Sequence, residues 1–159
     1  MADKVRHCAH CGNVLEPATL ERISAGEPPM VLTLLGLPLL RCAKGHAAPV
    51  HRDFMVWLMR TLRERAGTEV PGAEAKGMLF KKYYCACGAQ LPGQAGREGT
   101  FTLELAFEGA PPFRAEILTP LYKCAACGKE QARSAAELAG RVPEAVKNIN
   151  DAAGFPHSG

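Results

Sequence analysis

Aromatic residues make up only 6% of this 159-residue chain, and its longest apolar stretch, Met30 to Leu40, is interrupted by Thr33, Gly36 and Pro38. That stretch is well short of the roughly 20 apolar residues that a membrane helix needs, so we expect no membrane span and no membrane partner. The chain does not open with a basic segment and an apolar core, so we expect no secretory signal and a cytoplasmic location. The length also excludes a barrel enzyme of about 250 residues.

Recognisable catalytic motifs are missing as well. The sequence has no phosphate-binding loop, no G-x-G-x-x-G fingerprint and no H-E-x-x-H zinc-protease motif. Ser24 and Ser134 lack the context of a hydrolase nucleophile. The formal net charge of +3 is small for a nucleic-acid-binding protein. We therefore expect no enzymatic activity and no small-molecule substrate.

Cysteine, in contrast, is abundant, with seven copies. In a reducing cytosol such cysteines favour metal binding over disulfides. Four of them form two close pairs, each directly followed by glycine, in Cys85-Ala-Cys87-Gly88 and Cys124-Ala-Ala-Cys127-Gly128. Short spacing lets both thiolates of a pair reach one ion, and glycine allows the turn that aims backbone N–H groups at the sulfurs. We expect these four cysteines to hold one structural Zn²⁺.

The first half of the chain offers three further cysteines, Cys8, Cys11 and Cys42. We take His46 as the fourth ligand, because the segment Cys42-Ala-Lys-Gly45-His46 places it near the position that Cys127 has in the second half. The competing candidates are His51, His7 and His10. With His46 as a ligand, every cysteine has a role and the chain binds two Zn²⁺ ions.

The two halves share one order of motifs, which indicates an internal duplication. Each has a Cys-Gly pair, a Pro-Pro pair, a P-x-x-x-C segment and a helical pattern. In order, these are Cys11-Gly12, Pro28-Pro29 and Pro38 to Cys42, then Cys87-Gly88, Pro111-Pro112 and Pro120 to Cys124. We expect one unit in residues 1–67, a linker and entry strand in 68–80, and a second unit in 81–159.

Alternating apolar and polar residues predict a β-hairpin between the cysteine pairs of the second half. Its strands are expected at Phe101 to Phe107 and Phe113 to Ile117. The first half is less regular, with strands expected at 19–24 and 30–35. Val31 to Leu35 is apolar on both faces, which implies deeper burial.

A helix is expected after each second knuckle, at about 53–66 and about 134–153. Asp53 is the expected N-cap of the first helix, and Gly67 is placed to end it. In the second, Ser134 and Glu137 have the spacing of a capping box, and Pro143 is expected to restart the helical run.

With these knuckles and hairpins, both halves resemble the zinc ribbon, a family in which two C-x-x-C-G knuckles hold a β-hairpin over a zinc ion. The closer likeness is to the bacterial antitoxin-type zinc ribbon, and residues 36–42 and 119–124 carry it. The resemblance covers residues 5–52 and 82–133. It implies a small metal-bound α+β fold of two duplicated zinc-ribbon units, each followed by an α-helix. No antitoxin-type helix-turn-helix domain follows, so toxin neutralisation and operator binding are not implied.

Paired knuckles also bind iron in rubredoxin-type electron-transfer proteins, but the missing fourth cysteine and the shortened Cys85–Cys87 pair disfavour iron. Each ribbon is too small to be stabilised by its own core. We therefore expect zinc to supply much of its folding free energy.

The helix after the first knuckle pair begins with six consecutive apolar residues, Phe54 to Met59. Such a run covers the helix all round, so it needs the second ribbon, a second copy or another protein to bury it. The residues proposed to bind a partner are Phe54, Trp57, Leu58 and Arg60. We expect a protein-interaction or scaffold module whose partner is another protein or a second copy of the chain. The alternative is nucleic-acid binding through Lys81, Lys82, Tyr83 and Tyr84.

Overall fold

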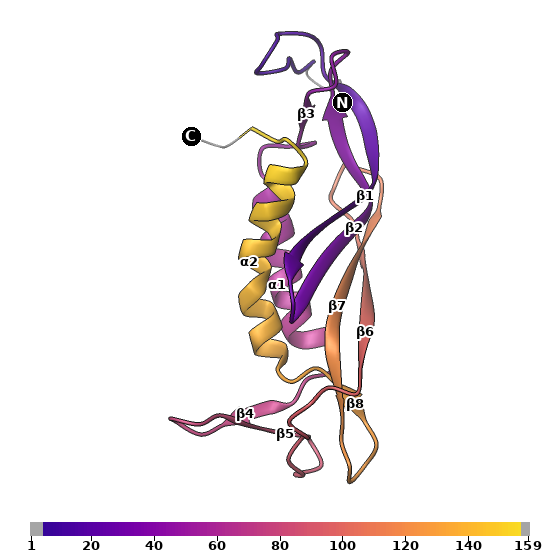
Figure 1. Cartoon of the computed structure of the whole chain (residues 1–159). Coiled ribbons are helices and arrows are strands. Elements are labelled where there is room, and N and C mark those ends of the chain that lie inside the picture. Colours follow the sequence, from indigo (N-terminus) through magenta and orange to yellow (C-terminus); the bar gives the residue numbers. More distant parts are fainter. Residues whose placement is uncertain (1–4, 157–159) are drawn as a thin grey trace.

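The computed structural model describes residues 5–156 and shows a small α+β protein in which two helices cover one face of an antiparallel sheet (Figure 1). The elements in chain order are β1 (Glu16–Glu27), β2 (Met30–Arg41), β3 (Ala47–Ala48), α1 (Phe54–Glu69), β4 (Glu74–Lys76), β5 (Lys82–Tyr84), β6 (Arg97–Leu105), β7 (Phe113–Lys123), β8 (Glu130–Gln131) and α2 (Ala135–Ala152).

The main sheet consists of two hairpins joined edge to edge. Its strand order is β1-β2-β7-β6, with the short strands β3 and β8 pairing with β2 and β7. The seam is antiparallel and pairs Val31 with Leu118 and Leu35 with Arg114. Because β2 and β7 run in opposite directions, the open ends of the two hairpins lie at opposite ends of the sheet (Figure 1).

Gly36 explains why β2 is more apolar than a regular strand. Leu32 and Leu34 are fully buried before it, and Leu37 and Leu39 after it, so the inward side of the strand shifts by one residue. Gly36 has a φ of +71°, a left-handed conformation that glycine adopts without strain. Both halves of this twelve-residue strand therefore face the core.

The hairpin predicted in the second half is present, with longer strands. Leu103 and Leu105 point into the core opposite Ala115 and Phe113, as the alternation indicated. β7 continues to Lys123, directly before the second cysteine pair. This strand therefore reaches its metal ligands without an intervening loop, whereas residues 88–96 separate the first cysteine pair from β6.

Helix α1 buries one stripe of residues at i, i+4 spacing, namely Phe54, Leu58, Leu62 and Ala66. Asp53 precedes the helix, but its side chain makes no capping hydrogen bond. The expectation that Gly67 ends the helix is wrong, because α1 runs through it to Glu69. The helix ends where Val70 turns extended before Pro71, as steric crowding by proline favours.

Helix α2 begins with the predicted cap, since the Ser134 hydroxyl accepts a hydrogen bond of 3.1 Å from the backbone N–H of Glu137. The predicted restart at Pro143 is wrong, because a single helix includes this proline. Val142, Val146 and Ile149 are all buried on one face, and this packing holds the helix together across the hydrogen bond that proline cannot donate.

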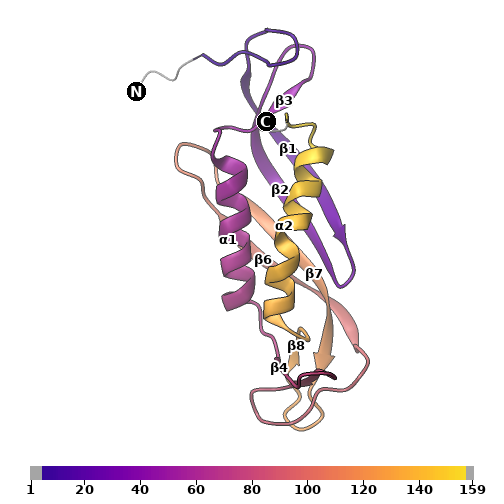
Figure 2. The ribbon, with the colours of Figure 1, turned by 90° about the vertical axis from the view of Figure 1, so that its left-hand side faces the viewer.

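Each helix covers the hairpin of the other half. The ring of Phe54 on α1 lies 5.8 Å from that of Phe113 on β7, and the Arg65 guanidinium donates to the Glu104 carbonyl on β6. Helix α2 packs on β1 and β2 and against α1 (Figure 2). One hydrophobic core therefore contains residues from both halves.

This exchange determines where the four α1 residues proposed to bind a partner lie. Phe54 and Leu58 are fully buried. Trp57 is half-buried against Phe107, with ring centroids 5.1 Å apart, whereas Arg60 is exposed. The apolar helix start is thus covered largely by the second hairpin.

Candidate metal centres

Four short knuckles with one common backbone geometry carry the candidate ligands. In each, the first cysteine's carbonyl accepts a hydrogen bond from a glycine N–H three or four residues later, at 2.8–2.9 Å. The four glycines, which have φ between +74° and +95°, are Gly12, Gly45, Gly88 and Gly128. The positive φ lets the chain turn tightly enough for two side chains to reach one point.

The hairpins bring these knuckles together in pairs. In the first half one knuckle precedes β1 and the other follows β2, and in the second half one precedes β6 and the other follows β7. Because a hairpin returns the chain to its starting end, each pair meets at the open end of its hairpin. The first centre lies beside β3 and the second beside β8, at opposite ends of the molecule (Figure 1).

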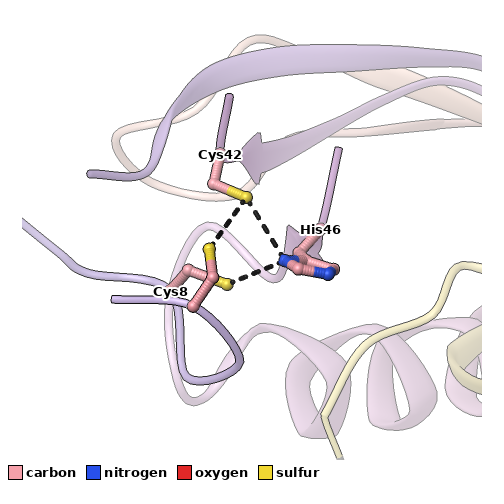
Figure 3. Close-up of side chains that lie close together, drawn as sticks. Cys8, Cys42 and His46 are labelled. Carbon is pink, nitrogen blue, oxygen red and sulfur yellow. Dashed lines mark hydrogen bonds between the residues drawn. The ribbon is translucent and has the colours of Figure 1, made fainter. Parts of the chain in front are cut away.

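In the first centre, the side chains of Cys8, Cys11, Cys42 and His46 place one ligand atom each within 4.8 Å of all the others. Nδ1 of His46 lies 3.5 Å from Sγ of Cys8 and 3.5 Å from Sγ of Cys42 (Figure 3). The Sγ atoms of Cys11 and Cys42 are 3.6 Å apart. Further N–H···S contacts to Cys8 and Cys11 come from the His10 backbone and the Asn13 amide.

The three competing histidines lie outside this cluster. Nδ1 of His7 is 3.2 Å from the Gly12 carbonyl, and Nδ1 of His51 accepts from the Asp53 N–H at 3.1 Å. The His10 ring lies beside that of His46, tilted by 42° and with centroids 5.0 Å apart. The structure therefore places His46, rather than its competitors, with the three cysteines.

The second centre consists of Cys85, Cys87, Cys124 and Cys127, whose Sγ atoms also lie within 4.8 Å of one another. The separations are 3.6 Å between Cys85 and Cys127 and 3.6 Å between Cys87 and Cys124. The shortened Cys85–Cys87 pair still closes the cluster, because Gly88 turns the chain directly after it. Cys85 and Cys124 are buried, whereas Cys87 and Cys127 are exposed.

These spacings fit a tetrahedral zinc ion. Zn–S bonds of about 2.3 Å separate two sulfur ligands by about 3.8 Å, and a sulfur and a nitrogen ligand by about 3.6 Å. The observed 3.6 Å between sulfurs and 3.5 Å between sulfur and nitrogen are close to both values. The two centres could thus hold two metal ions, the number expected from the sequence.

The backbone already favours a negative charge on one buried cysteine of the first centre. Burial by itself would raise the pKa of Cys42, but the N–H groups of His46 and Lys44 and the neighbouring thiols lower that pKa to about 6. The backbone N–H of Asn13 acts in the same sense on Cys11, yet burial and the thiols of Cys42 and Cys8 leave the Cys11 pKa raised. Charge on one sulfur therefore opposes charge on the next.

The second centre shows the same alternation. The N–H of Cys87 and the side chain of Gln131 lower the pKa of Cys85 to about 6. The Ala89 N–H favours the Cys87 thiolate, but interactions with Cys124 and Cys85 outweigh it and raise the pKa of Cys87 to about 11. A divalent cation would relieve this conflict, because it contacts all four thiolates at once and offsets two of their negative charges.

Gln131 is a site residue that the sequence analysis missed. It is fully buried on β8, and its amide lies near enough to lower the pKa of Cys85 although neither amide atom has a hydrogen-bond partner at ordinary distance. Its one sequence signal is its position four residues after the Cys127 ligand.

The residues of the nucleic-acid alternative lie on and beside β5. Lys81 and Lys82 are exposed, and Tyr83 and Tyr84 are half-buried. Lys76 lies 5.2 Å from the centre of the Tyr84 ring, and Arg133 lies 4.9 Å from that of Tyr83. One face of each tyrosine is therefore occupied by a cation of the same chain, which leaves less aromatic surface for base stacking.

Fold and site together define a small α+β protein with an antiparallel sheet, two helices and two cysteine-rich centres that could hold metal ions. Comparisons with protein families, curated proteins and solved structures find no match. Within residues 5–156, neither helix is long and apolar enough to cross a membrane.

Proposed function

We propose that this is a non-enzymatic zinc protein in which two structural zinc ribbons support a protein-interaction or scaffold role. The observation that carries the proposal is the pair of four-ligand clusters, in each of which all donor atoms lie within 4.8 Å of one another. Four protein donors fill the tetrahedral shell of zinc, so neither ion keeps the open position that hydrolytic zinc needs.

The placement of the clusters supports a structural role for the metal. Each cluster joins the two ends of a hairpin that is anchored in the shared core. The ligands Cys8 and Cys42, with the neighbouring Leu15 and Ala48, form a small buried cluster of their own at one end. When bound there, zinc supplies charge neutralisation and a cross-link between knuckles.

The test is native mass spectrometry with elemental analysis of the purified protein, which reports the metal, its number and the oligomeric state together. We expect two zinc ions per chain in the wild type and one each in Cys42→Ser and Cys124→Ser. His46→Ala should also lose one ion, whereas His10→Ala, the matched control, should keep both. A single zinc in the wild type, or iron in place of zinc, would contradict the proposal.

A further inference from the structure

The β4–β5 hairpin carries the most exposed large apolar side chains of the described chain at its tip. Met78, Leu79 and Phe80 are 98%, 90% and 85% exposed. The hairpin stands out from the body of the protein near the second metal centre (Figure 1). Three adjacent apolar side chains in water do not stabilise this fold, and such exposed groups mark a contact surface.

The tip is a turn with a defined backbone conformation. β4 and β5 pair up to Lys76 and Lys82, and Gly77 opens the turn with a φ of +113°. A Cβ atom at Gly77 would lie 2.5 Å from the Phe80 carbonyl oxygen, so only glycine fits there. Directly before β4, the Ala73 N–H donates to the carbonyl of Ala132, the residue after β8, at 3.0 Å. The apolar side chains are thus presented by an anchored ribbon.

Positive charge surrounds this tip. Lys76, Lys81 and Lys82 are all exposed, and none of them forms an ion pair within residues 5–156. The one acidic residue of the two strands, Glu74, lies at the end of β4 farthest from the turn. Three apolar side chains at the tip, with three lysines where the turn joins the strands, match a surface that is apolar inside and anionic outside.

We propose that this tip inserts into the surface of an anionic phospholipid membrane. Met78, Leu79 and Phe80 would enter the boundary between headgroups and acyl chains, while the three lysines contact lipid phosphates. Such peripheral attachment needs no membrane-spanning segment. A nucleic acid matches the tip less well, because its phosphate surface offers no apolar layer for three exposed side chains.

This inference goes beyond the proposed function and does not depend on it, because the tip contains none of the eight candidate metal ligands. It also departs from the expectation, made from the sequence, that no membrane is a partner. The composition of the Gly77 to Lys81 segment gave no sign that its apolar residues would be exposed together.

Co-sedimentation with vesicles tests the proposal. Vesicles of phosphatidylcholine mixed with phosphatidylglycerol should pellet the wild-type protein at low salt, and pure phosphatidylcholine vesicles should pellet it much less. The triple variant Met78→Ser, Leu79→Ser, Phe80→Ser should bind at least about tenfold more weakly. Lys81→Gln and Lys82→Gln should each weaken binding about fivefold at low salt. Val56→Ser changes an apolar residue that is 53% exposed on α1 and serves as the matched control.

Insertion itself is measured with the Leu79→Trp variant. The fluorescence of the introduced tryptophan should shift to the blue with anionic vesicles, and lipids brominated in their acyl chains should quench it. Unchanged zinc content and circular dichroism verify that the variants fold. The proposal is overturned if wild-type protein does not pellet with anionic vesicles, or if the triple variant pellets equally well. It is also overturned if the tip instead drives dimerisation or tip-dependent binding to one protein, without vesicle binding.

Discussion

At the scale of single residues, the two ligands of each knuckle differ in their surroundings. Cys8, Cys42, Cys85 and Cys124, the first ligands, are all buried. Backbone N–H groups at Cys42, Cys85 and Cys124 lower the pKa of those thiols. The exposed Cys87 has a raised pKa, because a second and third negative charge beside it are unfavourable. Each metal-free centre therefore holds protons that a metal ion must displace.

This proton displacement makes zinc affinity depend on pH. Because the pKa of Cys87 is raised to about 11, its thiol is protonated near neutrality and zinc competes with that proton. Apparent affinity at the second centre should fall by about tenfold or more per pH unit, from about pH 8 to about pH 6. Competition with a chromophoric chelator measures it in Cys42→Ser, where only the second centre binds zinc. An affinity that stays constant over this range would show that Cys87 is already ionised.

At the scale of secondary structure, Gly36 determines which side chains of β2 face the core. Its positive φ shifts the inward side of β2 by one residue, so that both halves of the strand reach the core. The space around its Cα is open, so an added methyl group would meet no neighbouring atom. Any cost of substitution there comes from the backbone conformation alone.

Gly36→Ala should therefore lower the free energy of unfolding by about 1–2 kcal/mol, because alanine resists the left-handed conformation. Gly140→Ala is the matched control, an exposed glycine on α2 that also has open space around it. That substitution should raise the stability by up to about 1 kcal/mol, since alanine favours a helix. Urea denaturation of the zinc-loaded proteins measures both changes. Equal effects of the two substitutions would mean that the conformation at Gly36 is not strained for alanine.

Elements that are determined by residues close together in the sequence were predicted from the sequence pattern. The alternation from Phe101 to Ile117 predicted the second hairpin, and the spacing of Ser134 and Glu137 predicted the cap of α2. The same kind of signal failed at Gly67 and Pro143, where burial of a continuous helix face outweighs the residue's own preference. Close cysteine spacing likewise predicted which ligands meet, because a knuckle is formed by neighbours in sequence.

At the scale of the whole molecule, the decisive contacts join residues far apart in the chain. The β2–β7 seam and the exchange of helices between halves have no local signature, so the sequence analysis treated each half as a ribbon with its own helix. Each of these features follows from two halves completing one core.

The shared core changes what metal removal should do. None of its buried residues is a cysteine, whereas cysteines make up half of the buried members of each small cluster at the ends of the molecule. Loss of zinc therefore removes the cross-links at the two ends and leaves the apolar contacts between sheet and helices in place. A core that stays folded without zinc would differ from the expectation that zinc supplies much of the folding free energy of each half.

We accordingly predict that a zinc chelator, under reducing conditions, unfolds the ends and leaves the centre of the protein folded. Hydrogen exchange should accelerate in residues 8–13, 42–46, 85–89 and 124–129, while β2, β7, α1 and α2 stay protected. The helical circular dichroism signal should persist, and added zinc should restore protection at the knuckles. If chelation instead abolishes the helical signal in one cooperative step, zinc and the core form a single folding unit. Helices α1 and α2 would then depend on metal ligands that they do not contact.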